Sequence, residues 1–120
     1  MKKTVMIADD DPDILFTIGV MLETAGYEVI STLDGTYVLE GEYESPDLYL
    51  LDKGIPDLDG IEICRQLRKR LVSANIPIIV ISASPRSRQE ALNAGANAFL
   101  EKPFQMKDLL AAVKKFAGPV

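Results

Sequence analysis

Apolar residues along this chain fall into two alternating patterns. Short apolar runs, typical of strands in a sheet that is covered on both faces, predict strands at 4–8, 27–32, 48–51, 77–82 and 98–101. Each run is followed by a stretch in which apolar residues recur at helical spacing. Five repeats of strand and then helix predict an α/β fold, with a parallel sheet and helices on both of its faces.

Capping and turn residues mark the helices between these runs. The first predicted helix starts at Pro12, with Asp11 as its N-cap, and ends at Gly26. The second, 36–43, is a weak helix because Gly41 interrupts it. The third predicted helix has Ile63, Cys64, Leu67 and Leu71 on one face. The fourth spans 89–94 and ends at Gly95. The fifth is marked by Leu109, Leu110, Val113 and Phe116.

Length, net charge and cysteine content limit the number of domains, the binding partners and the cellular location that we expect. A length of 120 residues suits one compact domain, which we place at 1–120. The net charge of -5 argues against direct binding to nucleic acid or to an anionic membrane by this domain. The basic run Arg65, Arg68, Lys69 and Arg70 is therefore interpreted as a solvated helix face. A single cysteine, Cys64, and the lack of a long apolar run predict a cytoplasmic protein without a membrane span.

Two residue types limit the chemistry. The chain has no histidine, which excludes Ser-His and Cys-His nucleophiles and histidine metal sites. Cys64 shares its helical spacing with Leu67 and Leu71, so we interpret it as a core residue and not as a metal ligand or redox centre. Any reaction must then use carboxylates, lysine, hydroxyl groups and a metal.

Acidic residues gather where the predicted strands end. Asp9 and Asp10 follow the first strand and Asp52 ends the third. In open parallel sheets, ligands bind beyond the carboxyl ends of the strands, so these side chains should converge. Asp11 accounts for helix capping, which leaves Asp9 and Asp10 as neighbouring carboxylates that repel each other unless a cation lies between them. Oxygen ligands alone favour Mg²⁺, with Mn²⁺ as a substitute.

A lysine and a hydroxyl complete the same edge. Lys102 precedes Pro103 after the fifth strand, and a cis bond there would aim the lysine into the acidic cluster. The alternative for Lys102 is a surface lysine before a helix, and Ser82 either ends the fourth strand or donates its hydroxyl to a ligand. A carboxylate nucleophile at Asp52, a metal, a lysine and a hydroxyl together predict a phosphoryl-transfer site.

Four segments carry a family resemblance over essentially the whole chain. They are "DDDP" at 9–12, "LLDKGIPDLDG" at 50–60, "ISAS" at 81–84 and "GANAFLEKPF" at 95–104. With their spacing, they resemble the receiver domain of bacterial two-component response regulators. The resemblance implies a flavodoxin-like, doubly wound (βα)5 fold with strand order 2-1-3-4-5.

The resemblance also implies a role for each site residue. Asp52 would accept a phosphoryl group from a phosphohistidine on a histidine kinase or a histidine phosphotransfer protein. Asp10 and Asp52 would bind Mg²⁺ directly with the backbone carbonyl of Gly54, and Asp9 would act through water. Lys102 would hold the phosphate. The chain would then be a signalling domain that assists its own phosphorylation and dephosphorylation, and not an enzyme acting on other substrates.

A switch belongs to the same expectation. Ser82 would turn its hydroxyl toward the phosphate, and Phe99 would move inward with it. Without the resemblance, Phe99 is simply a core aromatic. The surface formed by the fourth helix, the fifth strand and the fifth helix would change, to be read by a downstream protein or a fused effector domain. Dimerisation through that surface is a further option that the resemblance leaves open.

Two residues depart from the family pattern. Lys53 stands where an aliphatic residue is usual, and we expect its side chain to point away from Asp52. Gly54 has no side chain where the family usually has one, which leaves the phosphate more open to water or a partner.

Two other classes of protein compete with a phosphorylated signalling domain: an interaction module, and an enzyme that is either a flavin carrier or an aspartyl-enzyme phosphatase. An interaction module that works without phosphate usually lacks one of the acidic pair, the acceptor or the lysine, all of which this chain has. A flavin carrier should offer a phosphate loop rich in glycine, serine and threonine, whereas "DDDP" would repel phosphate. An aspartyl-enzyme phosphatase should have a second aspartate where Gly54 stands.

Overall fold

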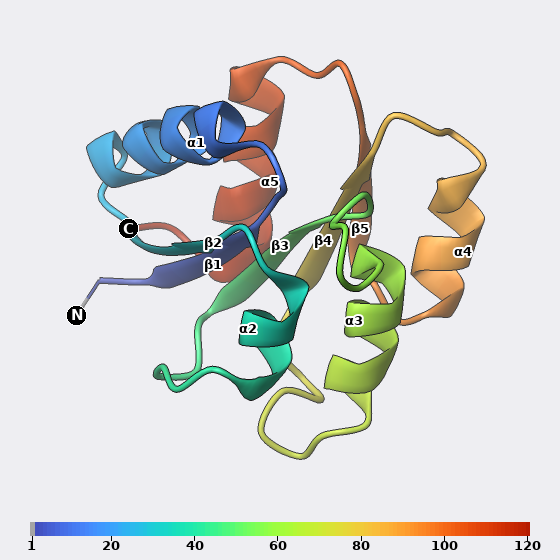
Figure 1. Cartoon of the computed structure of the whole chain (residues 1–120). Coiled ribbons are helices and arrows are strands. Elements are labelled where there is room, and N and C mark those ends of the chain that lie inside the picture. Colours follow the sequence, from blue (N-terminus) through green and yellow to red (C-terminus); the bar gives the residue numbers. More distant parts are fainter. Residues whose placement is uncertain (1) are drawn as a thin grey trace.

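A computed structural model describes residues 2–120, so Met1, the first residue of the predicted domain, lies outside the described residues. Five parallel strands form one sheet in the order β2-β1-β3-β4-β5, which confirms the predicted fold (Figure 1). The elements in chain order are β1 Thr4–Ala8, α1 Pro12–Thr24, β2 Glu28–Thr32, α2 Gly35–Glu40, β3 Leu48–Asp52, α3 Gly60–Arg68, β4 Ile78–Ser82, α4 Ser87–Asn93, β5 Ala98–Glu101 and α5 Met106–Ala117.

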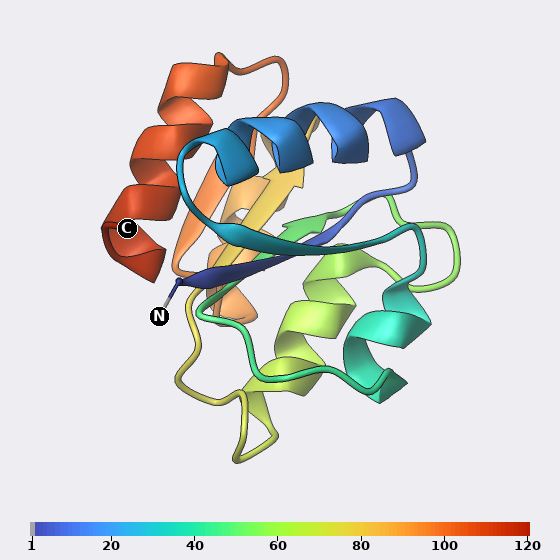
Figure 2. The same ribbon diagram turned by 90° about the vertical axis from the view of Figure 1, so that its left-hand side faces the viewer.

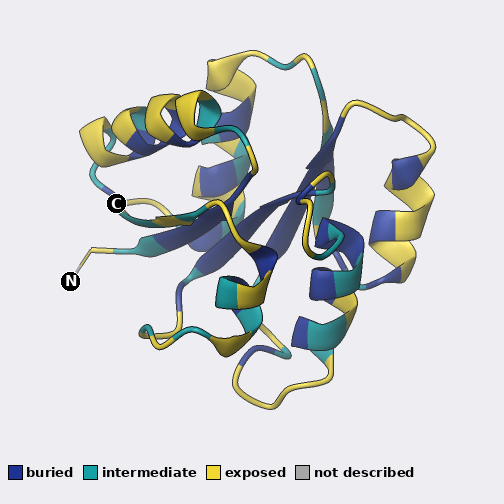
Figure 3. Cartoon of the chain, in the orientation of Figure 1, coloured by how far each residue is buried: buried dark blue, intermediate teal, exposed yellow. Residues whose placement is uncertain are grey.

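The sheet lies between two layers of helices. Helices α1 and α5 cover one face, and α2, α3 and α4 cover the other (Figures 1 and 2). Neighbouring strand residues point to opposite faces, so Ile7 and Leu50 pack toward α1 and α5, whereas Met6 and Leu51 pack toward α2–α4. Both faces are therefore buried, which explains the continuous apolar runs (Figure 3).

Local chemistry accounts for where α1 and α2 begin and end. The Asp11 carboxylate accepts hydrogen bonds from the N–H groups of Asp13 and Ile14, at 2.9 and 3.4 Å, as expected for the N-cap of α1. Gly26, just beyond α1, has φ of 103°, a conformation that favours glycine. Helix α2 ends at Glu40, earlier than predicted, because Gly41 turns to an extended backbone.

Helix α3 is shorter than its apolar spacing predicts. It ends at Arg68, and Leu71, which was predicted to lie on its buried face, is 98% exposed. The chain turns because the Ser73 hydroxyl donates a 2.6 Å hydrogen bond to the carbonyl of Leu67, which competes with further helical bonds. Cys64 is fully buried, which confirms it as a core residue.

The solvated-face interpretation is wrong for Arg68. Its Nε donates to the Gly95 carbonyl at 2.9 Å, and its terminal nitrogens donate to Ser73, Ile76 and Asn97 at 3.2, 2.7 and 2.8 Å. The planar guanidinium presents several donors in a fixed arrangement, which suits this set of carbonyl acceptors. Arg68 therefore ties α3 to the turns before β4 and β5.

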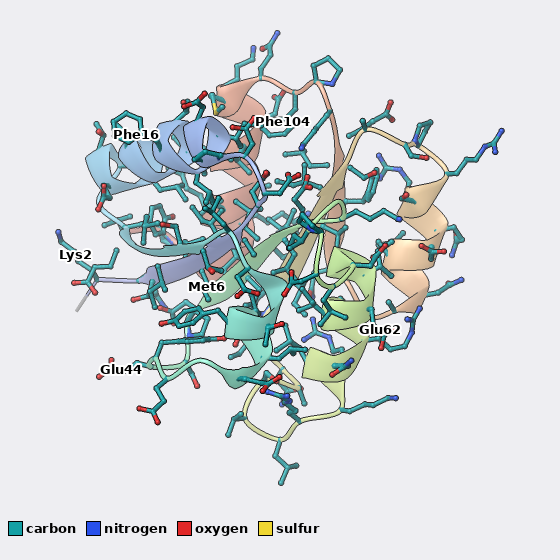
Figure 4. All side chains as sticks on the ribbon, viewed as in Figure 1. Lys2, Met6, Phe16, Glu44, Glu62 and Phe104 are labelled. Carbon is teal, nitrogen blue, oxygen red and sulfur yellow. The ribbon has the colours of Figure 1, made fainter. Side chains whose placement is uncertain are left out.

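The outer surface carries a few apolar side chains. Phe16 extends from α1 and is 73% exposed (Figure 4). Within residues 2–120, the structure contains no helix with the length and apolar character that a membrane crossing requires.

Candidate functional site

The carboxyl ends of four strands bring the predicted site residues to one edge of the sheet. Asp10 follows β1, Asp52 is the last residue of β3, Ser82 is the last residue of β4, and Lys102 follows β5. These four side chains line a cleft of about 490 Å³. The parallel register produces this convergence, because it places Asp52 beside Ile81 and Ser82 beside Glu101.

Three carboxylates form an acidic cluster in this region. Asp9, Asp10 and Asp52 each offer a carboxylate oxygen, and these oxygens lie within 4.8 Å of one another. Asp9 and Asp52 are buried, whereas Asp10 is exposed. An all-oxygen donor set with one side open to solvent fits Mg²⁺, which binds few carboxylates and keeps several waters. The residues present therefore fit the metal predicted from the sequence.

Burial disfavours the ionised form of the Asp9 carboxylate. Desolvation raises its pKa to about 6; the hydrogen bond from the Asp11 N–H opposes this shift and the nearby Asp52 carboxylate adds to it. The folded state therefore binds a proton at Asp9 more tightly than the unfolded chain, and stability falls as the pH rises from 3.8 to about 6. A cation bound among these oxygens would offset that loss.

Lys102 points into the acidic cluster. Its Nζ lies 2.7 Å from Oδ1 of Asp52 and 3.9 Å from Oδ2 of Asp9, and the Lys102–Pro103 peptide bond is cis. Burial lowers the pKa of Lys102, but the contact with Asp52 and the charges of Asp9 and Asp10 outweigh it, and the net pKa is raised. Lys102 is therefore a fixed positive charge beside Asp52, and the surface-lysine alternative is wrong.

The backbone holds Asp52 from the other side. The N–H of Gly54 donates to Oδ2 of Asp52 at 2.9 Å, and the N–H of Gly60 donates to the carbonyl of Lys53 at 3.1 Å. A Cβ at Gly60 would lie 2.9 Å from the carbonyl carbon of Asp52 and closer still to its oxygen. In the sequence, Gly60 is the last residue of the segment 50–60 and had no role beyond the turn into the next helix. Its position in the first turn of α3, where glycine is a poor helix former, was the available sign of a close backbone approach.

The other aspartates of the loop after β3 have structural roles. Asp59 caps α3, because its Oδ1 accepts from the Ile61 N–H at 2.7 Å. Asp57 does more than turn the chain toward α3. Its carboxylate accepts from the N–H groups of Gly35 and Thr36, both at 2.9 Å, and from the Thr36 hydroxyl at 2.7 Å. The loop is thereby fixed to the start of α2.

The two predicted switch residues lie on adjacent strands. Ser82 is buried, and its Oγ accepts a 3.0 Å hydrogen bond from the Ser84 N–H. Phe99 is buried in the core between the sheet and α2–α4. The Arg88 guanidinium of α4 lies 5.0 Å from the centre of the Phe99 ring, a cation–π contact. Phe99 therefore contacts both the sheet and α4.

Comparison with known proteins identifies the family. The family model described as "Response regulator receiver domain" matches residues 5–114. The chain belongs to the response regulator receiver domain family. This receiver domain is 37% identical over 117 residues to the alkaline phosphatase synthesis transcriptional regulatory protein PhoP of Bacillus subtilis, covering 95% of this chain and 48% of PhoP. The receiver domain thus spans about half the length of the curated relatives it matches.

Solved structures agree with this assignment. A putative response regulator from Chloroflexus aurantiacus matches the receiver domain with a TM-score of 0.92 and 29% identity, covering 98% of each chain. The receiver domain of the sensor histidine kinase PA1611 from Pseudomonas aeruginosa matches with a TM-score of 0.87 and 30% identity, covering 98% of this chain and 99% of that one. That structure has a magnesium ion coordinated in its active site cleft. Receiver domains bind Mg²⁺ at an acidic pocket, and in this chain Asp9, Asp10 and Asp52 form an acidic cluster whose oxygens fit that ion.

Proposed function

We propose that this receiver domain accepts a phosphoryl group on Asp52 from the phosphohistidine of a histidine kinase or histidine phosphotransfer protein. The observation that carries the proposal is the 2.7 Å contact between Lys102 Nζ and Asp52 Oδ1, at the end of the sheet that also holds Asp9 and Asp10. A carboxylate with a fixed ammonium beside it and an acidic cation site next to it can receive a phosphoryl group, whose charge both cations would stabilise.

Each side chain of the site has a separate role in phosphoryl transfer. An oxygen of Asp52 forms the new bond to phosphorus as the bond from phosphorus to the donor nitrogen breaks, and the electron pair leaves with the imidazole. Bound Mg²⁺, held by Asp10, Asp52 and the Gly54 carbonyl and by Asp9 through water, would supply positive charge to the phosphoryl oxygens. Lys102 would bind another phosphoryl oxygen. Transfer to a carboxylate oxygen needs no histidine as a base, so the lack of histidine does not prevent the reaction.

The output is proposed to be a shift between two conformations. A phosphate adds about 1.5 to 2 negative charges beside Ser82 and Lys102. Moving a population from 1:99 to 99:1 requires about 5.5 kcal/mol of differential interaction. Ser82 turning toward the phosphate and Phe99 rearranging against α4 would change the α4-β5-α5 face. A downstream protein, a fused effector domain or a second copy would then bind that face.

The first test is phosphorylation by a small donor. We expect the wild-type chain to gain one phosphoryl group when incubated with acetyl phosphate and Mg²⁺, and none when EDTA replaces Mg²⁺. Intact mass measures the gain, and peptide mapping places it in the segment 48–60. An unmodified chain would contradict the proposal and favour an interaction module of the same fold that works without phosphate.

Gly54 is expected to set the lifetime of the phosphate. A Cβ there would lie 3.1 Å from Asp52 Oδ2, so a side chain at 54 would cover the acceptor. Gly54→Met should still be phosphorylated, but its phosphate should last several-fold longer because the side chain excludes water. Gly54→Asn should also change the lifetime. Mass measured over time after removal of the donor tests this, and equal lifetimes in all three proteins would refute it.

A further inference from the structure

Lys53 is a second positive charge in the cleft with no role assigned so far. Of the described residues that line the cleft, two carry positive charge, Lys53 and Lys102. Lys102 is engaged with the acidic cluster, because its Nζ contacts Asp52 and Asp9. The Nζ of Lys53 instead lies 2.9 Å from Oδ2 of Asp59.

The partner of Lys53 can release it at little cost. The side chains of Lys53 and Asp59 are 32% and 43% exposed, and ion pairs in contact with solvent contribute little to stability. Asp59 also has a function of its own, because its other oxygen, Oδ1, caps α3 at the Ile61 N–H.

The route from Lys53 to the acceptor is open. Lys53 and Asp52 both line the cleft, and Gly54, which lines it with them, has no side chain to fill it. The cleft also contains the carboxylates of Asp10 and Asp52, with Asp9 next to them in the acidic cluster, and the whole chain carries a net charge of -5. An anionic phosphate donor is therefore repelled at long range, and cations at the entrance would increase its rate of capture.

We propose that Lys53 captures the phosphate of the incoming phosphodonor, by exchanging the Asp59 carboxylate for the phosphate before transfer to Asp52. This role rests on the proposed phosphorylation of Asp52 and extends it to recognition of the donor. Lys53 thus acts on the substrate, which is any donor with an exposed dianionic phosphate, and acetyl phosphate is the probe.

The test measures the second-order rate constant for phosphorylation by acetyl phosphate in Mg²⁺. At an ionic strength of about 0.01 M, where charges act over about 30 Å, Lys53→Met should react about threefold more slowly than wild type, or slower still. At about 1 M the difference should vanish, because charges then act over only about 3 Å. Lys53→Arg, which keeps the charge, should retain the wild-type rate.

Two control variants separate capture from other effects. Lys69→Met loses the same charge from the exposed C-terminal end of α3, and it should react like wild type. Asp59→Asn removes the ion pair but keeps an oxygen that can cap α3, so it should react as fast as wild type or faster. Mg²⁺ affinity, measured by calorimetry, should not fall in Lys53→Met, because removing a cation cannot weaken binding of another.

Each contrary result is informative. Equal rate constants for wild type and Lys53→Met at low ionic strength would overturn the role of Lys53 while leaving phosphorylation of Asp52 intact. An equal decrease of the rate constant in Lys69→Met would also overturn it, because the effect would then follow from net charge alone. An equal decrease in Asp59→Asn would overturn it too, because the ion pair would then have a structural role. A wild-type chain that accepts no phosphoryl group would overturn both proposals.

Discussion

Asp52→Ala is expected to accept no phosphoryl group from acetyl phosphate in Mg²⁺, while wild type gains one. The substitution removes the carboxylate that lies 2.7 Å from Lys102 Nζ, which is also one of the three carboxylates of the acidic cluster. Within residues 2–120, aspartates outside the acidic cluster belong to no group of acidic side chains that could hold a metal, so they cannot replace it. Intact mass of both proteins after the same incubation gives the result directly.

Asp108→Ala is the matched control for this experiment. Asp108 is an exposed aspartate in the first turn of α5, outside the cleft, and its loss changes the net charge by the same amount. It should be phosphorylated like wild type. An Asp52→Ala protein that gains as much mass as the control would show that the acceptor is another residue.

Gly60→Ala is expected to lower the free energy of unfolding by about 1 to 3 kcal/mol, the usual cost of overpacking a close contact. The new methyl group would overlap the backbone carbonyl of Asp52, which cannot swing aside as a flexible side chain can. Alanine is the better helix former, so a loss of stability would run against intrinsic propensity. Urea unfolding followed by far-UV circular dichroism measures the change. Phosphorylation of Asp52 should also slow, because its backbone would shift.

Gly54→Ala is the control that tests whether the loss of stability is specific to Gly60. A Cβ at Gly54 meets only the side-chain oxygen Oδ2 of Asp52, at 3.1 Å, and Gly54 is exposed. Its stability should stay within about 0.5 kcal/mol of wild type, as for most surface substitutions. If the two variants unfold at the same urea concentration, the contact between Gly60 and the Asp52 carbonyl does not limit stability.

The sheet and its acidic edge were predictable because they depend on short-range patterns. A run such as Ile78–Ser82 can only be buried, and once the strands are parallel their carboxyl ends must meet. The position of Lys102 followed from a single proline after β5. The sequence therefore predicted the location of the site better than the ends of the helices around it.

What escaped prediction depends on contacts between distant residues. Leu71 continues the helical spacing of Leu67, yet α3 ends before it because the turn after Arg68 forms other hydrogen bonds. Arg68 resembled its charged neighbours until the turns at Ser73 and Gly95 came within reach of its guanidinium. Gly60 is needed only because the Asp52 backbone lies against it. None of these contacts leaves a periodic signal in the sequence.

The sheet divides the interior into two compartments, and this division governs how the chain can change over time. Ile7 and Leu50 contact one set of helices, and Met6 and Leu51, next to them in sequence, contact the other. A change of side-chain volume on one side is felt only by neighbours in the same compartment. Compensating substitutions should therefore pair within a compartment, so the packing against α1 and α5 can drift independently of the side that holds Phe99 and α4.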